Sequence, residues 1–465
     1  MININTRKDQ HMAVFGLGAS GRAAAAALAA SGADVLAWDD DAGSRDRAAA
    51  SGIALADLYA CDWDAVDALV LAPGVPLTHP PHRVVELAAG ADCPVLGDVE
   101  LLVESCPRSR FIAITGTNGK STTTALTGHV LAAAGMDVRV GGNLGPPALA
   151  FAPPAPACVF ALELSSYQLD LTRRAAFDVA VLLNITPDHL DRHGDMAGYV
   201  AAKRRIFRDH PSPGGRQTAV IGIDDEHGRA ILDTVAGKEN WRTVPVSSGQ
   251  SLDHGVFARD GILYDALEDG EPRPVAELAA CATLPGSHNW QNAAAAYAVA
   301  RAMGVEAAVI AAALATYPGL PHRQELVRRI NGIGYVNDSK ATNAEAASQA
   351  LACYRNIYWI AGGLAKQGGL GPALEHAANI RHGFLIGSAA PEFAAALAEH
   401  VPVTDCGTLA DALGRAHRLA QSERLDDAVV LLSPACASFD QWKSFEARGD
   451  AFRAMVLDLS AGDAP

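Results

Sequence analysis

The sequence predicts an α/β protein with three domains, and three observations lead to this prediction. Short runs of β-branched and other apolar residues alternate with alanine-rich helical patterns along almost the whole chain, as in proteins with parallel sheets. Two glycine-containing turns each join such a run to a helix. The chain has 465 residues, whereas one domain contains roughly 100 to 200, so several cores are expected.

The first domain is expected at residues 1–105 and the second at residues 106–319. In the second domain, the pair Asp260-Gly261 lies between two apolar runs, which predicts a β-hairpin and therefore an antiparallel part of the sheet. Parallel strands are predicted in these two domains at residues 11–15, 34–38, 68–71, 111–115, 159–164, 179–184 and 219–223.

The third domain is expected at residues 320–465. Its start is marked by Pro318-Gly-Leu-Pro321, where two prolines and a glycine break the preceding helical pattern and stiffen the connection. Beyond this linker, strands are predicted at residues 334–337, 357–361, 383–386 and 428–432, again separated by helical patterns. The third domain is therefore expected to be another α/β unit.

Composition and charge exclude several classes of protein. Lysine and arginine total 37 against 52 acidic residues, and the resulting charge of -15 argues against nucleic acid as a partner. The eight cysteines are scattered without a C-x-x-C pair, which favours reduced thiols in the cytosol. The N-terminal decapeptide is polar and no apolar run reaches membrane length, so we expect a cytoplasmic protein without a membrane span.

The first glycine turn is Gly16-Leu-Gly-Ala-Ser-Gly21, between a short apolar run and an alanine-rich helix. Glycines at this spacing allow a tight turn and bring backbone N–H groups and a helix N-terminus close to a diphosphate. Either a dinucleotide or a nucleotide sugar would satisfy this chemistry, and a turn that binds nothing is also compatible with the pattern. The candidate contacts here are Gly16, Gly18, Ala19 and Ser20, with Gly74 in the next loop at the same sheet edge.

The second glycine turn is more specific, because a buried strand leads through Thr115-Gly-Thr-Asn-Gly-Lys-Ser-Thr122 into a helix. In such a phosphate loop, backbone N–H groups hold polyphosphate oxygens, Lys120 meets the β- and γ-phosphates, and a hydroxyl reaches Mg²⁺. Ile114 departs from the strict pattern, which has glycine there. The predicted nucleotide contacts are Gly116, Thr117, Asn118, Gly119, Lys120, Ser121 and Thr122.

This loop and several later blocks resemble the Mur ligase superfamily of ATP-dependent amide-forming enzymes. The resemblance covers the chain beyond its first ten residues and implies a Rossmann-like N-terminal domain, a central P-loop ATPase-type domain and a C-terminal Rossmann-like α/β domain. The matching blocks are Gly141-Gly-Asn-Leu-Gly145, Glu163-Leu-Ser-Ser-Tyr-Gln168, Asn184-Ile-Thr-Pro-Asp-His-Leu-Asp191, Ala202-Lys203, Gly286-Ser-His-Asn289, Leu320-Pro-His-Arg323, Asn337-Asp-Ser-Lys-Ala-Thr-Asn343 and Ser433-Pro-Ala-Cys-Ala-Ser-Phe-Asp-Gln-Trp442.

The last two blocks are similar to those of the Mur ligases that add glutamate. The resemblance therefore implies a monomeric ligase of peptidoglycan precursor synthesis that uses ATP and Mg²⁺. It also implies that UDP-N-acetylmuramoyl-L-alanine and D-glutamate are the substrates and that the carboxylate is activated as an acyl phosphate.

The resemblance also assigns roles to residues of the central domain. Lys120, Glu163, His189 and Lys203 are implied as catalytic residues. Ser121, Glu163, His189 and Lys203 would be Mg²⁺ ligands, the last only after carbamylation by CO₂ has converted an ammonium into a carboxylate-like group. Without the resemblance, Glu163 could equally form a salt bridge or cap a helix, His189 could lie at the surface, and Lys203 could be a solvated charge beside Arg204.

Further residues are implied as ligand contacts. Asn292, Arg323 and Asp338 would bind ATP, and Asn143 and His189 would bind the nucleotide-sugar substrate. Thr342, Lys366, Ser438, Phe439 and the backbone around Phe445 would hold the two carboxylates of the incoming amino acid. Helix caps at Thr342 and Ser438 and a loop cation at Lys366 are the simpler alternatives. In Gly362-Gly-Leu-Ala-Lys366, Leu364 and Ala365 depart from the family pattern.

Three other functions stay open on the sequence alone. A NAD-dependent dehydrogenase would explain only the first domain and has no use for the phosphate loop. A nucleotide-dependent switch would explain that loop but not the third domain. Folylpolyglutamate synthase and the other Mur ligases would share the chemistry but not the two C-terminal blocks. An L-glutamate-specific ligase stays open, because both enantiomers offer the same groups and residue identities alone do not fix their arrangement.

Overall fold

The computed structural model describes residues 1–210, 216–365 and 369–459, and its strands form three sheets. The chain divides into two compact units. The first comprises Met1–Leu278 with Asn289–Thr316 and contains the four-stranded and nine-stranded sheets; the second comprises Ala279–His288 with Tyr317–Pro465 and contains the six-stranded sheet. The predicted α/β class is confirmed.

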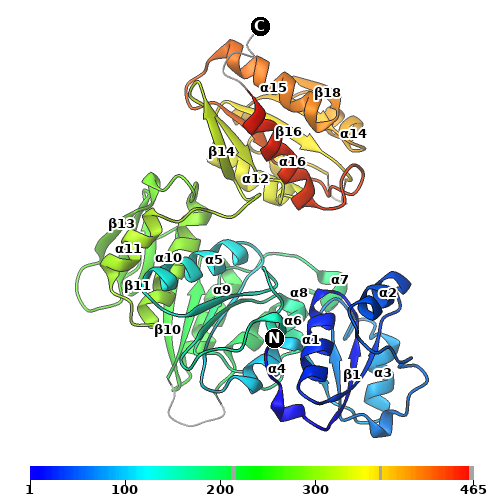
Figure 1. Cartoon of the computed structure of the whole chain (residues 1–465). Coiled ribbons are helices and arrows are strands. Elements are labelled where there is room, and N and C mark those ends of the chain that lie inside the picture. The colour runs from blue at the N-terminus through cyan, green and yellow to red at the C-terminus, as the bar shows by residue number, and fades with distance from the viewer. Residues whose placement is uncertain (211–215, 366–368, 460–465) are drawn as a thin grey trace. The chain divides into compact units, whose positions relative to one another are not determined.

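The four-stranded sheet is parallel and has the strand order β2-β1-β3-β4, with α1 and α3 on opposite sides of β1 (Figure 1). The first glycine turn brings the start of α1 close to the end of β1. A Cβ on Gly21 would lie 1.7 Å from the Gly16 carbonyl oxygen. Only glycine fits there. The elements are β1 (His11–Phe15), α1 (Ala19–Ala30), β2 (Asp34–Trp38), α2 (Ala42–Ala50), β3 (Ala68–Leu71), α3 (Arg83–Gly90), β4 (Val95–Leu96) and α4 (Asp98–Ser105).

The nine-stranded sheet has the order β13-β12-β11-β10-β9-β8-β5-β7-β6. Asp260 and Gly261, both with positive φ, turn β11 back into β12, which confirms the predicted hairpin. Its strands are β5 (Arg110–Thr115), β6 (Val138–Gly142), β7 (Val159–Glu163), β8 (Val179–Leu182), β9 (Gln217–Gly222), β10 (Trp241–Ser247), β11 (Gly255–Arg259), β12 (Ile262–Ala266) and β13 (Arg273–Glu277). Its helices are α5 (Lys120–Ala133), α6 (Ser166–Asp170), α7 (Leu190–His193), α8 (Met196–Arg204), α9 (Glu226–Ala236), α10 (Ser287–Ala302) and α11 (Ala307–Ala315).

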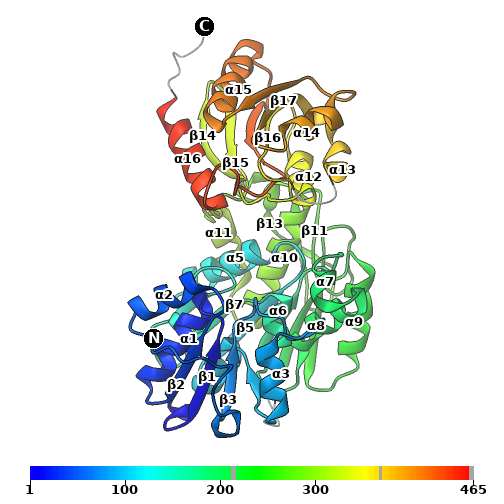
Figure 2. The same ribbon diagram turned by 90° about the vertical axis from the view of Figure 1, so that its right-hand side faces the viewer.

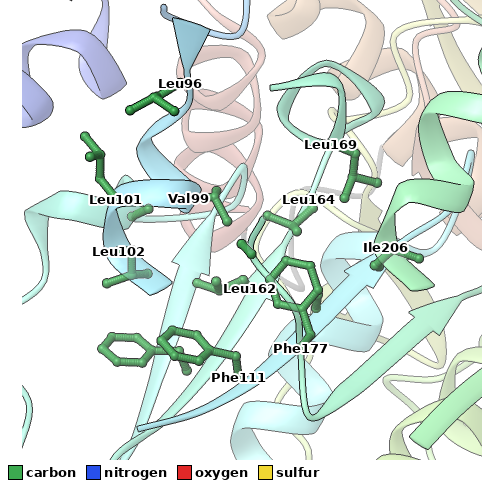
Figure 3. Close-up of a cluster of buried hydrophobic side chains, with 14 of the residues drawn as sticks. Leu96, Val99, Leu101, Leu102, Phe111, Leu162, Leu164, Leu169, Phe177 and Ile206 are labelled. Carbon is green, nitrogen blue, oxygen red and sulfur yellow. The ribbon is translucent and has the colours of Figure 1, made fainter. Parts of the chain in front are cut away.

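One hydrophobic core extends across both sheets of the first unit. Side chains of α4, including Val99, Leu101 and Leu102, belong to the same buried cluster as Leu162 of β7 and Leu164, which follows that strand (Figure 3). A buried carboxylate adds a polar connection, because Glu100 on α4 accepts hydrogen bonds from three backbone N–H groups in the loop after α6. One continuous core therefore supports both the phosphate loop and the first glycine turn.

The six-stranded sheet of the second unit has the order β14-β15-β19-β16-β17-β18 and is parallel except for β14. Helices α12 and α14 cover one face, and α15 and α16 cover the other (Figure 2). The elements are β14 (Glu325–Ile330), β15 (Ile333–Asn337), α12 (Ala344–Cys353), β16 (Ile357–Gly362), α13 (Gly371–Leu374), β17 (Ile380–Ile386), α14 (Ala390–Leu397), β18 (Val403–Gly407), α15 (Leu409–Glu423), β19 (Val429–Leu432) and α16 (Phe445–Asp458). Of the helices that the structure describes, none is both long and apolar enough to cross a bilayer.

The Glu100 carboxylate gives a first testable prediction. The change Glu100→Ala leaves the N–H groups of Arg173, Arg174 and Ala175 without their acceptor, at a cost of about 3 kcal/mol. We expect faster amide hydrogen exchange in the loop after α6 and a lower thermal midpoint. The control is Glu104→Ala on the same helix, which removes a more exposed ion pair and costs about 1 kcal/mol or less. Equal effects of both changes would contradict the proposed polar connection.

Candidate active site

The phosphate loop occupies the turn between β5 and α5. Gly119 has φ of +83° and precedes α5, so the backbone enters the helix through a conformation that favours glycine. The Lys120 ammonium lies back over the loop and donates to the Gly116 carbonyl at 2.9 Å and the Thr117 carbonyl at 2.8 Å. The predicted loop residues are therefore brought together at the N-terminus of a 14-residue helix, where backbone N–H groups favour an anion.

A second loop, which follows β8, holds the phosphate loop in place. Asn184 accepts a hydrogen bond from the Asn118 N–H at 2.8 Å through its Oδ1, and its backbone carbonyl accepts from the Thr117 N–H at 2.9 Å. The Thr117 hydroxyl donates to the Thr186 carbonyl at 3.1 Å. Asn184 and Thr186 were not predicted as site residues, since their contacts join segments more than 60 residues apart.

Asn292 of α10 lies directly against the phosphate loop. Its Oδ1 is 2.2 Å from the position that a Cβ on Gly119 would occupy, and it accepts a hydrogen bond from the Thr123 hydroxyl at 3.2 Å. Its amide donates to Asn289 Oδ1 at 3.1 Å. The structure thus joins this predicted nucleotide contact to the loop residues, although its role toward adenine stays a prediction.

Glu163 lies at the end of β7, which pairs with both β5 and β6. Its side chain is buried, with only 2% of the residue's surface exposed. Oε1 accepts a 2.6 Å hydrogen bond from the Asn143 amide, whereas Oε2 has no hydrogen-bond partner among the described residues. A buried carboxylate oxygen without a donor is suited to a hard cation.

Lys203 is buried on the inner side of α8, with 1% of its surface exposed. Its Nζ donates to the Gly116 carbonyl at 2.8 Å, so two lysine amines share this carbonyl oxygen. Burial, followed by repulsion from Lys120, lowers the pKa of Lys203 well below its usual value. The ring of Tyr199, which the sequence interpretation did not assign to the site, lies 4.7 Å from Nζ. Burial therefore favours the uncharged form of this amine, and the side chain is not a solvated helix charge.

His189 precedes α7 in the left-handed backbone region and is half exposed. Its Nδ1 lies 2.9 Å from the Tyr167 hydroxyl, and its Nε2 lies 3.4 Å from an Asp188 carboxylate oxygen. Within the described part of the chain, no three His, Cys, Asp or Glu side chains form a group that could hold a metal ion. A divalent ion would therefore also need hydroxyl or phosphate oxygens, as Mg²⁺ at nucleotide sites commonly does.

The first glycine turn leaves the N-terminus of α1 without a side-chain cap. Gly16 has φ of +89°, and Gly18 occupies the position before Ala19, so the first N–H groups of α1 have no side chain to accept from them. The Asp39 carboxylate accepts from the Leu17 N–H at 2.5 Å. The Asp39 carboxylate therefore stabilises the turn, and it is already hydrogen-bonded in the absence of a ligand.

In the second unit, Asp338 follows β15 and Ser433 follows the neighbouring strand β19. The Ser433 hydroxyl donates to the Asp338 carboxylate at 2.8 Å, and the Gln324 N–H donates to it at 3.2 Å. Burial raises the pKa of Asp338 to about 7, although these hydrogen bonds and the charge of Arg323 oppose that shift. The predicted pair Arg323 and Asp338 is therefore electrostatically coupled at the carboxyl end of the sheet.

The predicted amino-acid contacts are only partly brought together. Ser339 donates a 2.8 Å hydrogen bond to the Phe445 carbonyl, which links that residue to the block containing Asp338. Ser438 is buried, whereas Phe439 is 71% exposed. Thr342 is half-buried, and Lys366 lies outside the described residues.

Arg448 is a buried residue of this region that the sequence interpretation missed. It donates to Ser339 Oγ at 3.0 Å and to the carbonyls of Ser339 and Cys436 at 2.9 and 3.1 Å. It therefore joins the two C-terminal blocks. In the sequence, Arg448 is a charged residue within the first turns of the last helix. Such a position is ordinarily solvated, so its burial could not be predicted from the sequence.

Comparisons with known proteins agree with this geometry. Residues 114–300 match the Mur ligase middle domain. The chain is 52% identical over 458 residues to a UDP-N-acetylmuramoylalanine–D-glutamate ligase from Rhodospirillum rubrum, covering 97% of this chain and 95% of that protein. It is 51% identical over 470 residues to the protein of the same name from Caulobacter vibrioides, covering 99% and 98%.

Solved structures share the fold at lower identity. The UDP-N-acetylmuramate–alanine ligase MurC from Thermotoga maritima has a TM-score of 0.56 at 16% identity and covers 96% of this chain and 99% of that one. MurF from Acinetobacter baumannii has a TM-score of 0.56 at 19% identity, with coverage of 97% and 94%.

The contact between Gly119 and Asn292 gives a second prediction. The change Gly119→Ala strains a left-handed backbone position and places a methyl group against Asn292 Oδ1. We expect ATP binding, measured by calorimetry, to weaken about tenfold, which corresponds to about 1.4 kcal/mol. The matched control is Gly135→Ala, which has φ of +81° but has no atom within 4 Å of the new Cβ. An unchanged affinity in Gly119→Ala would show that this contact does not shape the nucleotide site.

Proposed function

Because the chain belongs to the Mur ligase family, we propose that it joins D-glutamate to UDP-N-acetylmuramoyl-L-alanine with hydrolysis of ATP to ADP and phosphate. It is a ligase that forms an amide during the synthesis of peptidoglycan precursors. The observation that carries the proposal for the chemistry is the position of Glu163. This buried carboxylate has one oxygen without a hydrogen-bond partner among the described residues, and it lies on the strand beside the one that leads into the phosphate loop.

The proposed reaction activates a carboxylate before the amine attacks it. Transfer of the γ-phosphoryl group from ATP to the substrate carboxylate gives an acyl phosphate, and the amine of D-glutamate then displaces phosphate to form the amide. For both steps the protein mainly has to position anions and neutralise their charge. We propose that the loop N–H groups of Gly116 to Ser121 and the ammonium of Lys120 bind the phosphate oxygens and neutralise their charge.

Mg²⁺ is the proposed metal cofactor, and the donor set fits it. The Glu163 oxygen without a partner and the Ser121 hydroxyl at the start of α5 are hard oxygen donors, and phosphate oxygens of ATP would complete the coordination. When bound, Mg²⁺ supplies charge neutralisation for the phosphoryl group. His189 and a carbamylated Lys203 are proposed as ligands of a second ion near the substrate carboxylate.

The environment of Lys203 supports carbamylation. Only an uncharged amine can attack CO₂; the reaction forms an N–C bond, releases one proton and leaves an anionic carbamate. The lowered pKa supplies the uncharged amine, and the burial excludes water.

The remaining sites follow the same proposal. The N-terminus of α1, with Gly16, Gly18, Ala19 and Ser20, would hold the diphosphate of the nucleotide sugar, together with Gly74. Asn143 would contact the same substrate, while it also donates to Glu163. From the second unit, Arg323 and Asp338 are proposed ATP contacts, and Thr342, Lys366, Ser438, Phe439 and Phe445 are proposed to bind D-glutamate.

The proposed domain boundaries are 1–105 for the nucleotide-sugar domain, 106–319 for the ATP domain and 320–465 for the glutamate domain. We further propose that the enzyme is a cytoplasmic monomer. All eight cysteines are free, as is usual in a reducing compartment.

The Lys203 proposal predicts a specific dependence on CO₂. We expect Lys203→Ala to lower kcat about 100-fold or more, because a charged ligand near the transferred phosphoryl group is lost. Wild-type enzyme depleted of CO₂ should lose activity and regain it with bicarbonate, and ¹³CO₂ should give a carbamate signal in the ¹³C NMR spectrum. The control, Arg204→Ala, changes the exposed neighbour and should leave activity nearly unchanged. Full activity of Lys203→Ala would refute the carbamate.

The substrate proposal is tested by phosphate release and product mass. With Mg-ATP, UDP-N-acetylmuramoyl-L-alanine and D-glutamate, we expect turnover that requires all three and a product heavier by one glutamyl residue. Turnover with L-glutamate instead would reassign the stereospecificity. No product with either enantiomer would reject glutamate as the substrate, and folate and other amino acids would be assayed next.

A further inference from the structure

A cavity of about 380 Å³ lies in the second unit at the amino end of two parallel strands. Gly334 of β15 and Val429 of β19, which are paired in the sheet, both line it. Asp338 and Ser433 follow the opposite ends of these strands. Gly334 and Val429 are therefore separated from the proposed catalytic edge by the strand length, about 10 Å. In contrast, Cys353 and Tyr354, which also line the cavity, interact with the charge of Asp338.

Part of the cavity wall is apolar, and the absence of a side chain at Gly334 leaves this part open. A Cβ at Gly334 would lie 3.3 Å from Val429 Cγ1 and 3.5 Å from Leu326 Cδ1, so a larger side chain would occupy this space. Leu326 keeps 36% of its surface exposed, which is unusual for a large apolar side chain. Val336 lines the same space from β15. The volume falls within the range of roughly 300–1,000 Å³ that is typical of small-molecule sites, and the wall offers both apolar and polar contacts to a ligand.

Two arginines give the cavity its charge. Arg329 of β14 and Arg355, just beyond α12, both line it, and neither is in an ion pair with a residue that the structure describes. Arg329 donates a 3.3 Å hydrogen bond to the Gly332 carbonyl. Asp427 also lines the cavity, but it is beyond ion-pair distance of either guanidinium. The lining therefore carries one net positive charge in a chain whose overall charge is -15.

The remaining polar groups of the wall are neutral. Burial raises the pKa of the Cys353 thiol to about 12 and also raises the pKa of the Tyr354 phenol. The Cys353 thiol donates to the Gln349 carbonyl at 3.0 Å and lies 3.7 Å from the Pro285 carbonyl oxygen. Two walls of the cavity, the end of α12 and the chain before α10, are thus connected to each other.

We propose that this cavity binds a compact monoanion with an aromatic or aliphatic body, with its acid group paired to Arg329 and Arg355. The apolar strands would contact the body of the ligand, and the single net charge of the lining favours one negative charge over a polyphosphate. The site does not depend on the proposed ligase reaction, since no residue of its lining belongs to the nucleotide, metal or glutamate sites proposed above.

The experiment uses 2-naphthoate as the probe and 2-naphthamide as its uncharged counterpart, titrated into the full-length protein by calorimetry. For a ligand of this size we expect a dissociation constant of about 0.1–1 mM with naphthoate and at least about tenfold weaker binding with the amide. The double variant Arg329→Gln/Arg355→Gln should weaken naphthoate binding about tenfold or more. Gly334→Leu, which fills the cavity, should abolish it.

The matched control is Arg415→Gln/Arg418→Gln on α15, which removes the same charge from exposed positions of the same unit. Retained binding in this control, together with its loss in the Arg329/Arg355 variant, would support the site. Equal binding of acid and amide, absence of saturable binding, or equal loss in both double variants would overturn the proposal. Because both double variants change only exposed arginines, thermal midpoints close to wild type would exclude unfolding as the cause.

Discussion

The buried amine of Lys203 is the constraint on which the rest of the central site depends. An ammonium in this position would cost several kcal/mol, because it is buried and the nearby Lys120 repels it, and the charge of Asp188 opposes these effects only in part. The structure avoids this cost by lowering the pKa of the amine. The closely packed wall that includes Tyr199 then excludes water, and the Gly116 carbonyl is the acceptor for both amines. The Gly116 carbonyl thus connects the geometry of the phosphate loop to the protonation of Lys203.

Most of the fold could be predicted from the sequence, and the strands that escaped prediction have a common physical feature. The apolar runs of interior strands such as β5, β7, β16 and β19 were evident because both faces of these strands are buried. The strands β4, β6, β13, β14 and β18 were not predicted, and each lies at the edge of its sheet. Except for β4, which has only two residues, these strands are partly solvated, so their sequences are less apolar. Strand β10 is the exception, being an interior strand whose Pro245 interrupts the pattern.

The candidate site could be predicted only where its chemistry is local in the sequence. The loop from Gly116 to Thr122 was recognised because its strand, turn and helix are consecutive, and the structure confirms that arrangement. The support from Asn184 and the burial of Lys203 arise from contacts 66 and 87 residues apart, which no local pattern encodes. Arg448 is a similar case, since it donates to Ser339 109 residues away. Sequence motifs indicated which residue types are present at the site. The burial of these residues and their hydrogen-bond partners could be known only from the folded structure.

The contact between Thr123 and Asn292 has a consequence for how the protein is made. These residues are 169 positions apart, so the side chain that lies against the phosphate loop is added long after the loop itself. At typical synthesis rates of about 5–20 residues per second, the interval is roughly 10–30 s. During this time the nascent chain carries an exposed glycine loop without α10. A polypeptide truncated before residue 292 would therefore lack this part of the site, however well the earlier strands had folded.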